Sequence, residues 1–242
     1  MRLHIVRHGD PDYVNDSLTE RGVREAELLA DRLERLPVSA FYVSPLGRAR
    51  ETAEATLRRL HREAETLDWL QEVPLRRRDP ELPWETVIWD WLPEKWTAEP
   101  AFYDREGWQH APVMEAAGAP AWTAKVNTGL DALLAKHGYV RAGEIYRAEK
   151  PNRDSIVLFC HFGVECLLLS HLLGISPMPL WHGTCALTTS VTTLVTEERR
   201  EGIASFRMLT FGDVSHLTAA GVEPSFSGRF CETWDCAEER HD

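Results

Sequence analysis

The sequence predicts an α/β protein built as a three-layer α/β/α sandwich, in which helices cover both faces of a mostly parallel central sheet. Two observations lead to this fold class. Short apolar, β-branched runs alternate with amphipathic helical patterns from residue 3 to about residue 70, and the same alternation returns near residue 155. Such alternation indicates parallel strands, because a parallel pair needs a long crossover that is usually a helix.

The N-terminal elements follow this order. LHIVR (3–7) is a short apolar run that reads as a buried strand. In residues 18–36 the apolar positions recur at steps of three and four, which indicates one face of a helix, and Thr19 is a suitable N-cap. Three further elements are expected, namely a strand at 39–44, a helix rich in Ala, Arg and Glu at 47–64, and a short strand at 66–70.

Residues 72–122 interrupt the alternation. This stretch mixes prolines with Trp84, Trp89, Trp91 and Trp96 and has poor periodicity. We expect a Trp-rich insertion here, which is either a lid over the functional site or a small helical cap packed on the sheet. The sequence leaves both alternatives open.

The second half of the chain resumes the opening pattern. Helical sequence returns at about 122–137, and an apolar strand at 156–159 runs into His161. The expected elements after it are a helix at 164–174 and two strands at 190–198 and 204–213. The tail from about residue 222 is rich in Pro, Ser, Gly and acidic residues and is expected to be peripheral. We expect one domain over residues 1–242.

Composition and charge narrow the classes of function. The hydrophobic fraction of 43% and the charged fraction of 27% are ordinary for a globular protein. A formal charge of −11 argues against a nonspecific nucleic-acid binder, and no apolar run reaches the roughly 20 residues of a membrane helix. The N-terminus lacks the pattern of a secretory signal, and the 5 cysteines are an odd number. We therefore expect reduced thiols and a cytoplasmic location.

Chemically active side chains lie at the carboxyl ends of three of the expected strands. Arg7, His8 and Gly9 lie at the end of the first strand, Ser44 ends the second, and His161 follows a later one. Ligands of parallel sheets bind beyond the carboxyl ends of the strands. These residues are therefore expected to share one site.

The chain carries four motifs: RHG at 7–9, LTERG at 18–22, SPLGRARETA at 44–53 and FCHFG at 159–163. In this order and at these spacings they resemble the histidine phosphatase superfamily, also called the phosphoglycerate mutase-like family, from residue 3 to about residue 217. The resemblance implies a metal-independent phosphatase that hydrolyses a small phosphate monoester through a phosphohistidine intermediate, with no cofactor.

The resemblance also implies roles for individual residues. His8 is the expected nucleophile, because a neutral imidazole can attack phosphorus at physiological pH. Arg7 and Arg48 are expected to bind the phosphoryl oxygens through their planar guanidinium groups, with Arg50 as the reserve candidate. His161 is expected to donate to the phosphoryl group as charge develops in the transition state.

A proton donor for the leaving oxygen is expected on the loop after the third strand. WLQEVP (69–74) resembles the Leu-x-Glu stretch of the family and selects Glu72. Its competitors are Asp68, Glu81 and Glu85. The remaining candidates for substrate binding are Gly9 and Gly163, which would let the backbone approach the phosphate, and Asn15 in the loop after RHG.

Two other functions stay open. One is phosphoryl transfer of the phosphoglycerate mutase type, although Asp-Pro-Asp-Tyr at 10–13 departs from the usual stretch of the mutases, so hydrolysis is favoured. The other is a non-catalytic protein that binds a phosphorylated ligand. The expected partner is a small phosphorylated substrate, with no nucleic acid and no membrane, and the oligomeric state is left open.

Two further clusters are expected to have no role in the chemistry. The run RRR at 76–78 could hold a second anionic group of the substrate, but we favour solvated side chains, because three consecutive residues cannot all face one pocket. Cys231, Cys236 and His241 have poor spacing for zinc, so no metal site is expected.

Overall fold

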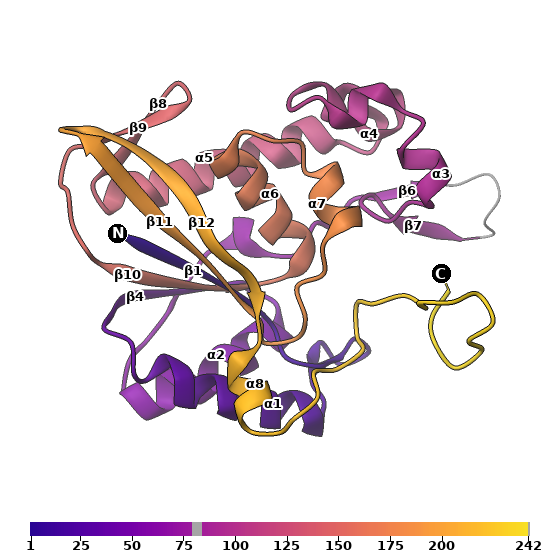
Figure 1. The fold of residues 1–242 in the computed structure, drawn as a ribbon, viewed down its shortest axis with the longest axis horizontal. Coiled ribbons are helices and arrows are strands. Elements are labelled where there is room, and N and C mark those ends of the chain that lie inside the picture. The colour runs from indigo at the N-terminus through magenta and orange to yellow at the C-terminus, as the bar shows by residue number, and fades with distance from the viewer. Residues whose placement is uncertain (79–83, 242) are drawn as a thin grey trace.

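The computed structural model describes residues 1–78 and 84–241. Within them, an eight-stranded sheet crosses the molecule and carries helices on both faces (Figure 1). The predicted three-layer α/β architecture is therefore confirmed. The strands, in the order in which they neighbour one another, are β5 (Glu65–Thr66), β4 (Val38–Val43), β10 (Ser155–Cys160), β1 (Arg2–Arg7), β11 (Val191–Arg200), β12 (Ile203–Asp213), β9 (Ile145–Ala148) and β8 (Tyr139–Ala142).

The core of the sheet is parallel, as predicted. β1 pairs in parallel with β10, β10 with β4, and β4 with β5. All six residues of β10 are buried, as expected for a strand that is covered on both faces. Beyond β1, the strands β11, β12, β9 and β8 run antiparallel to their neighbours. This outer half departs from the parallel pattern because short turns join β8 to β9 and β11 to β12, and short turns can connect only antiparallel strands.

Two groups of helices cover the sheet (Figure 1). One face carries α1 (Glu20–Leu33), α2 (Gly47–Leu60) and α8 (Ser215–Ala219). The other face carries α5 (Ala119–Lys136), α6 (Phe162–Leu173) and α7 (Met178–Gly183). The Thr19 hydroxyl accepts the backbone N–H of Gly22 at 3.0 Å, so Thr19 caps α1 as predicted.

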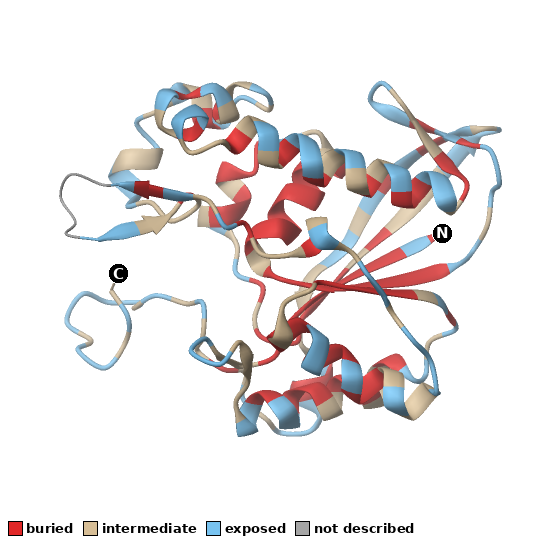
Figure 2. Cartoon of the chain, turned by 180° about the vertical axis from the view of Figure 1, so that it is seen from behind, coloured by how far each residue is buried: buried red, intermediate tan, exposed pale blue. Residues whose placement is uncertain are grey.

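The sheet separates two apolar cores, and buried residues concentrate where the helices meet the strands (Figure 2). Successive side chains of a strand point to opposite faces. In β1, Ile5 joins the core under α6, whereas Val6 joins the core with Leu29 and Leu33 of α1. Arg7, which comes next, is therefore expected on the α6 face.

The described residues between 72 and 122 form short elements that pack beside α5 and α7. The Trp108 ring is buried and meets Trp181 of α7 edge-on, with the ring centroids 5.4 Å apart. The elements are β6 (Arg76–Arg78), β7 (Glu85–Val87), α3 (Pro93–Trp96), η2 (Pro100–Tyr103), η3 (Gly107–His110), α4 (Pro112–Ala116) and the start of α5. The smaller elements elsewhere are β2 (Pro11–Asp12), β3 (Ser17–Leu18) and η1 (Asp68–Leu70).

The arginine run in β6 is not uniformly solvated. Arg76 and Arg78 are exposed, but Arg77 is buried, because side chains alternate along the strand. The Arg77 guanidinium donates to the backbone oxygen of Asp90 and lies 3.8 Å from the centre of the Trp91 ring. The expectation of a solvated run is therefore wrong for Arg77.

Across the described residues, no helix is both long enough and apolar enough to span a membrane.

Candidate active site

Hydrogen bonds between adjacent strand ends bring the predicted residues to one edge of the sheet. The backbone N–H of His8 donates to the Cys160 carbonyl at 3.0 Å, and that of Ser44 donates to the Phe159 carbonyl at 2.9 Å. His161 follows Cys160 directly and begins α6 as its N-cap. The ends of β1, β4 and β10 thus meet at one place because these strands are direct neighbours in the sheet.

The two histidines face each other across this edge. Their ring centroids are 5.1 Å apart, and both side chains are buried. His8 Nδ1 lies 2.7 Å from the Gly9 carbonyl oxygen. A carbonyl can only accept, so Nδ1 holds the proton and the lone pair lies on Nε2. His161 Nε2 lies 2.8 Å from the Ser44 hydroxyl.

Burial and two nearby cations keep both imidazoles neutral. The pKa of His8 is lowered well below its usual value by burial, and further by the charges of Arg7 and Arg48. The pKa of His161 is also lowered well below its usual value, by burial first and then by His8 and the same two arginines. A neutral His8 with a free Nε2 lone pair is the form that can attack phosphorus.

Arg48 lies in the first turn of α2 and is paired with an aspartate that the sequence analysis did not select. Its Nη1 lies 2.5 Å from Asp16 Oδ1, and the Gly47 N–H donates to Asp16 Oδ2 at 2.7 Å. The carboxylate thus occupies a position beside a guanidinium and a helix N-terminus, where an anion is favoured. Asn15 is exposed and its amide donates to Asp12 at 2.7 Å, and its role in substrate binding stays a prediction.

Glu72 lies against the start of α6. Its carboxylate accepts the N–H groups of Gly163 at 3.1 Å and Val164 at 3.0 Å, together with that of Val73 at 2.9 Å. Burial raises the pKa of Glu72, and these three N–H groups and the charge of Arg48 oppose that rise. A protonated carboxyl group is the form that a general acid needs.

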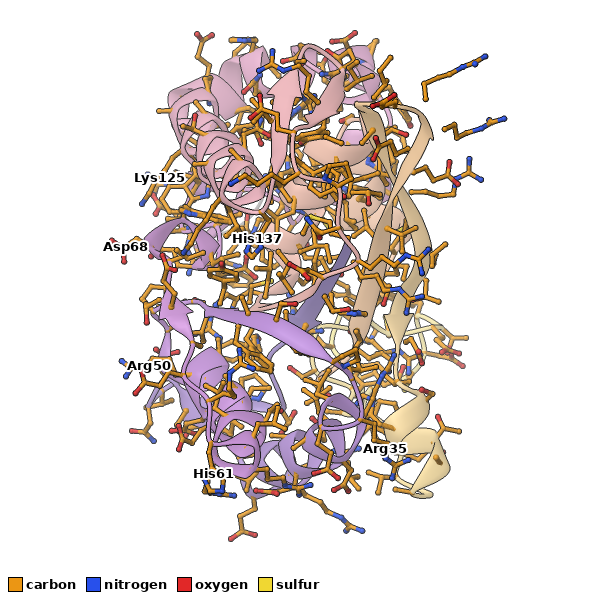
Figure 3. All side chains as sticks on the ribbon, turned by 90° about the vertical axis from the view of Figure 1, so that its left-hand side faces the viewer. Arg35, Arg50, His61, Asp68, Lys125 and His137 are labelled. Atoms are coloured by element: carbon orange, nitrogen blue, oxygen red, sulfur yellow. The ribbon has the colours of Figure 1, made fainter. Side chains whose placement is uncertain are left out.

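The competing residues lie elsewhere. Arg50 and Asp68 are exposed, and their side chains point outward from the surface (Figure 3). Glu85 is exposed in β7. Glu81 lies outside the described residues.

The two glycines approach protein atoms rather than open space. A Cβ at Gly163 would lie 2.5 Å from Glu72 Oε1 and 2.8 Å from the Trp89 indole nitrogen. A Cβ at Gly9 would lie 2.8 Å from the Gly22 carbonyl oxygen, and its N–H donates to Thr52 at 2.9 Å. Their predicted contact with phosphate stays a prediction. In the structure, Gly163 lies close to the Glu72 carboxylate, and Gly9 lies close to the backbone of α1 at Gly22.

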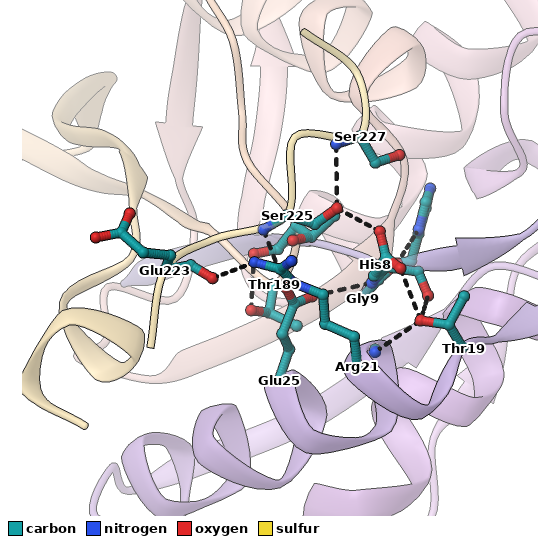
Figure 4. Close-up of polar contacts among 12 residues, drawn as sticks. His8, Gly9, Thr19, Arg21, Glu25, Thr189, Glu223, Ser225 and Ser227 are labelled. Atoms are coloured by element: carbon teal, nitrogen blue, oxygen red, sulfur yellow. Dashed lines mark hydrogen bonds and ion pairs between the residues drawn. The ribbon is translucent and has the colours of Figure 1, made fainter. Parts of the chain in front are cut away.

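The C-terminal segment returns to the strand ends (Figure 4). The Ser225 N–H donates to Glu25 Oε1 at 3.2 Å, and its hydroxyl donates to Asp10 Oδ1. Gly228 lies directly against Arg7, since a Cβ at position 228 would be 2.7 Å from Nη1 and Nη2. The expected peripheral location therefore does not describe this part of the tail.

The cysteine residues near the C-terminus contact one histidine. The His241 ring contacts both cysteines. Its Nδ1 lies 3.3 Å from Cys231 Sγ, and its Nε2 lies 2.8 Å from the Cys236 carbonyl oxygen. In the described part of the chain, no group of three or more His, Cys, Asp or Glu side chains is arranged to hold a metal ion.

Two neutral imidazoles, two guanidinium groups and one buried carboxyl group converge at this edge, an arrangement that suits phosphoryl transfer. Residues 3–208 match the family model of the histidine phosphatase superfamily (branch 1). The chain therefore belongs to the histidine phosphatase superfamily, in agreement with the four motifs.

Solved structures share the fold at low sequence identity. A phosphoserine phosphatase variant from Entamoeba histolytica, in complex with phosphoserine, is 19% identical with a TM-score of 0.59, covering 89% of this chain and 98% of that chain. A mycobacterial glucosyl-3-phosphoglycerate phosphatase is 19% identical with a TM-score of 0.55, covering 87% and 98%. The alpha-ribazole phosphatase from Shigella flexneri is 19% identical with a TM-score of 0.56, covering 88% and 97%. No curated protein sequence matches the chain.

Proposed function

We propose that the protein is a metal-independent phosphatase that hydrolyses a small phosphate monoester through a phosphohistidine at His8. The observation that carries the proposal is the state of His8. Its Nδ1 is fixed by the Gly9 carbonyl, and its ring is kept neutral by burial beside Arg7 and Arg48. A nucleophile with a defined lone pair and cations next to it is what attack on an anionic ester requires.

The first step transfers the phosphoryl group to the protein. Nε2 of His8 forms a bond to phosphorus as the bond from phosphorus to the ester oxygen breaks, and Glu72 gives its proton to the leaving oxygen. Arg7, Arg48 and His161 stabilise the phosphoryl oxygens. The raised pKa of Glu72 supports its assignment as the acid.

The second step releases phosphate. A water molecule attacks phosphorus, its proton passes to the Glu72 carboxylate, and the bond between phosphorus and Nε2 breaks. This returns His8 to the neutral form and Glu72 to the protonated form. No metal ion or external oxidant enters either step.

The substrate is proposed to be a small metabolite ester. Support comes from the similar structures, among which are a complex with phosphoserine and a complex with 3-phosphoglyceric acid. Trp89 packs edge-on against Phe162 with the ring centroids 6.0 Å apart, next to Gly163. This contact supports the proposal that the part of the segment 72–122 around Trp89 covers one side of the site.

The test is phosphate release from a panel of esters that includes phosphoserine and 3-phosphoglycerate, with a chelator present, for the native protein and for His8→Ala. The proposal expects turnover by the native protein that His8→Ala abolishes, and a phosphoenzyme of the native protein that is trapped by rapid denaturation. Transfer to a second hydroxyl in place of water would favour a mutase. Binding of phosphate without turnover of any ester would favour a non-catalytic protein. Turnover that persists in His8→Ala would mean that another residue is the nucleophile.

A further inference from the structure

A buried acid that the proposed reaction does not use lies behind Arg7. Glu165 stands in the first turn of α6 and is 1% exposed. Within the described residues, neither of its carboxylate oxygens makes a hydrogen bond of normal geometry, although the nearby Thr192 hydroxyl lowers its pKa. A buried carboxylate without partners is costly, so a fully satisfied structural role does not account for this residue.

Strand geometry places Glu165 on the same face as Arg7. In the register of β1 and β11, Ile5 lies opposite Thr192, and Ile5 belongs to the core under α6. Arg7 is two residues further along β1 and therefore points to that face as well. Thr192 lies opposite Ile5 and shares this face, and the Thr192 hydroxyl and the charge of Arg7 both lower the pKa of Glu165.

Arg7 itself is incompletely satisfied. Its Nη1 donates to the Ala186 carbonyl at 2.5 Å, whereas its Nε is buried and has no partner in the described part of the chain. The guanidinium and the Glu165 carboxylate therefore form a pair of buried opposite charges that interact through space without a direct hydrogen bond. Each of these two buried charges can offset part of the cost of burying the other.

We propose that Glu165 is a positioning residue that acts through Arg7: its carboxylate balances the guanidinium while the pocket is empty, and it takes up a proton when a tetrahedral dianion binds. The inference rests on the phosphoryl pocket proposed above. A dianion next to Arg7 brings negative charge close to Glu165, and a nearby like charge favours the neutral form of an acid.

The pKa of Glu165 lies close to the pH at which a proton would have to be taken up. Burial raises its pKa to about 7, although Thr192 and Arg7 oppose the rise. A modest further rise on binding would therefore protonate it at neutral pH. The proton comes from solvent and returns there when phosphate leaves, so the cycle is balanced without any co-reactant.

The other titratable groups around Glu165 and Arg7 do not titrate in place of Glu165, with one exception. Cys160 of β10 and Cys166 of α6 have pKa values raised well above their usual value by burial. His8 and His161 have pKa values lowered well below theirs. The exception is Glu72, whose pKa is also raised by burial.

The elements packed around α6 direct their remaining charges elsewhere. Three of these charges form ion pairs: Asp131 of α5 with His171, Arg207 of β12 with Glu197, and Asp213 of β12 with Arg32. The charged neighbours of His182 in α7 are Asp90 and Arg77.

The experiment uses sulfate as the probe, because it is a tetrahedral dianion that does not itself titrate near neutral pH. Its dissociation constant is measured by calorimetry at several pH values, in two buffers of different ionisation enthalpy, so that proton uptake is counted directly. For the native protein we expect uptake of at most about half a proton at pH 7, because Glu165 with a pKa of about 7 already holds about half a proton there, and the uptake should increase above pH 7. Sulfate binding should weaken about tenfold between about pH 6 and pH 8.

Three variants isolate the group responsible. In Glu165→Gln, which is permanently neutral, proton uptake should vanish and sulfate affinity should stay constant over this range. In Glu72→Gln, the uptake should persist. Asp131→Asn is the matched control, because it changes an acid beside α6 that is already paired with His171, and it should leave the uptake unchanged.

The possible failures are distinguishable. If the native protein does not bind sulfate, the proposed phosphoryl pocket fails, and this inference fails with it. If it binds sulfate without taking up a proton, the pocket stands and the role of Glu165 is overturned. Uptake that survives in Glu165→Gln overturns it as well. If Glu165→Gln fails to fold, Glu72→Gln still decides, because uptake that vanishes in this variant belongs to Glu72 and overturns the role of Glu165.

Discussion

The carboxylate of Glu72 accepts the backbone N–H of Gly163 at 3.1 Å, although 91 residues separate the two in the chain. The acid predicted on the loop after β5 is thus held by the helix that follows the second histidine. The same contact explains why position 163 lacks a side chain, since Glu72 and Trp89 occupy the space that a Cβ would take. Two motifs that are distant in sequence are therefore coupled by one carboxylate.

Gly163→Ala should displace Glu72 and lower kcat by about a hundredfold or more, the usual contribution of a positioned general acid. Steady-state kinetics on the best ester of the panel would measure this. Gly183→Ala is the matched control, because a Cβ there meets no atom within 4 Å. Equal rates for both variants would mean that Glu72 is not the acid, or that it adapts freely.

The neutral state of His8 predicts the pH profile. Its pKa is lowered well below the usual 6.5, so kcat/KM should not fall because of this group as the pH decreases through 6.5. Profiles should be measured with two esters whose own phosphate pKa values differ. An acid limb that moves with the ester belongs to the substrate. A limb fixed near 6.5 for both esters would contradict the lowered pKa.

Asp16→Asn should tighten the binding of sulfate several-fold, by about 1 kcal/mol or less, because Arg48 would no longer share its charge with an internal carboxylate. Competitive inhibition at low and high salt would measure this, and the gain should shrink at high salt. Weaker binding in the variant would instead show that Asp16 holds Arg48 in its productive orientation.

Gly228→Ala should weaken sulfate binding, because the new methyl group would lie 2.7 Å from the Arg7 guanidinium and force the tail or Arg7 to move. Gly221→Ala is a close control. Both glycines have positive φ, 88° and 66°, so both substitutions strain the backbone, but nothing lies within 4 Å of a Cβ at 221. If the two variants bind sulfate equally, the tail does not contact Arg7 in solution.

Glu165→Gln should stabilise the fold at alkaline pH. Burial raises the pKa of Glu165 from 4.5 to about 7, so its native carboxylate becomes a destabilising charge as the pH rises through this window. The shift corresponds to a penalty on the order of 3 kcal/mol above pH 7 and little near pH 5. Urea unfolding of both proteins at about pH 5 and pH 8 would test this. A difference that does not grow with pH would contradict the shifted pKa.

Much of the fold could be predicted because its central strands are short apolar runs and the first helix has a clear helical period. β1, β4 and β10 were predicted within one or two residues, and their order placed His8 and His161 at one edge. The hairpin of β8 and β9 was not predicted. Its strands are only four residues each and carry Arg141 and Arg147 among apolar residues, so neither shows the alternation of a longer strand.

The site was predictable where a motif marked it and not where tertiary structure assembled it. His8, Arg48 and Glu72 follow strands or begin a helix within recognisable motifs. Asp16 and Gly228 have no such local signal, because an ion pair with Arg48 and a contact with Arg7 depend on how a loop and the tail fold back. Glu165 reads as one acid in a helix, and only its burial without partners distinguishes it.

The position of β1 has a consequence for how the protein loses its structure. β1 lies between β10 on one side and β11 on the other, with both of its edges bonded and Leu3, Ile5 and Val6 fully buried. Segments of this kind exchange their amide hydrogens only when the whole domain opens. The amides around His8 should thus be among the slowest in the molecule, and those of the tail around Ser225 among the faster ones. Partial unfolding would then release the tail from Arg7 well before it disturbed His8.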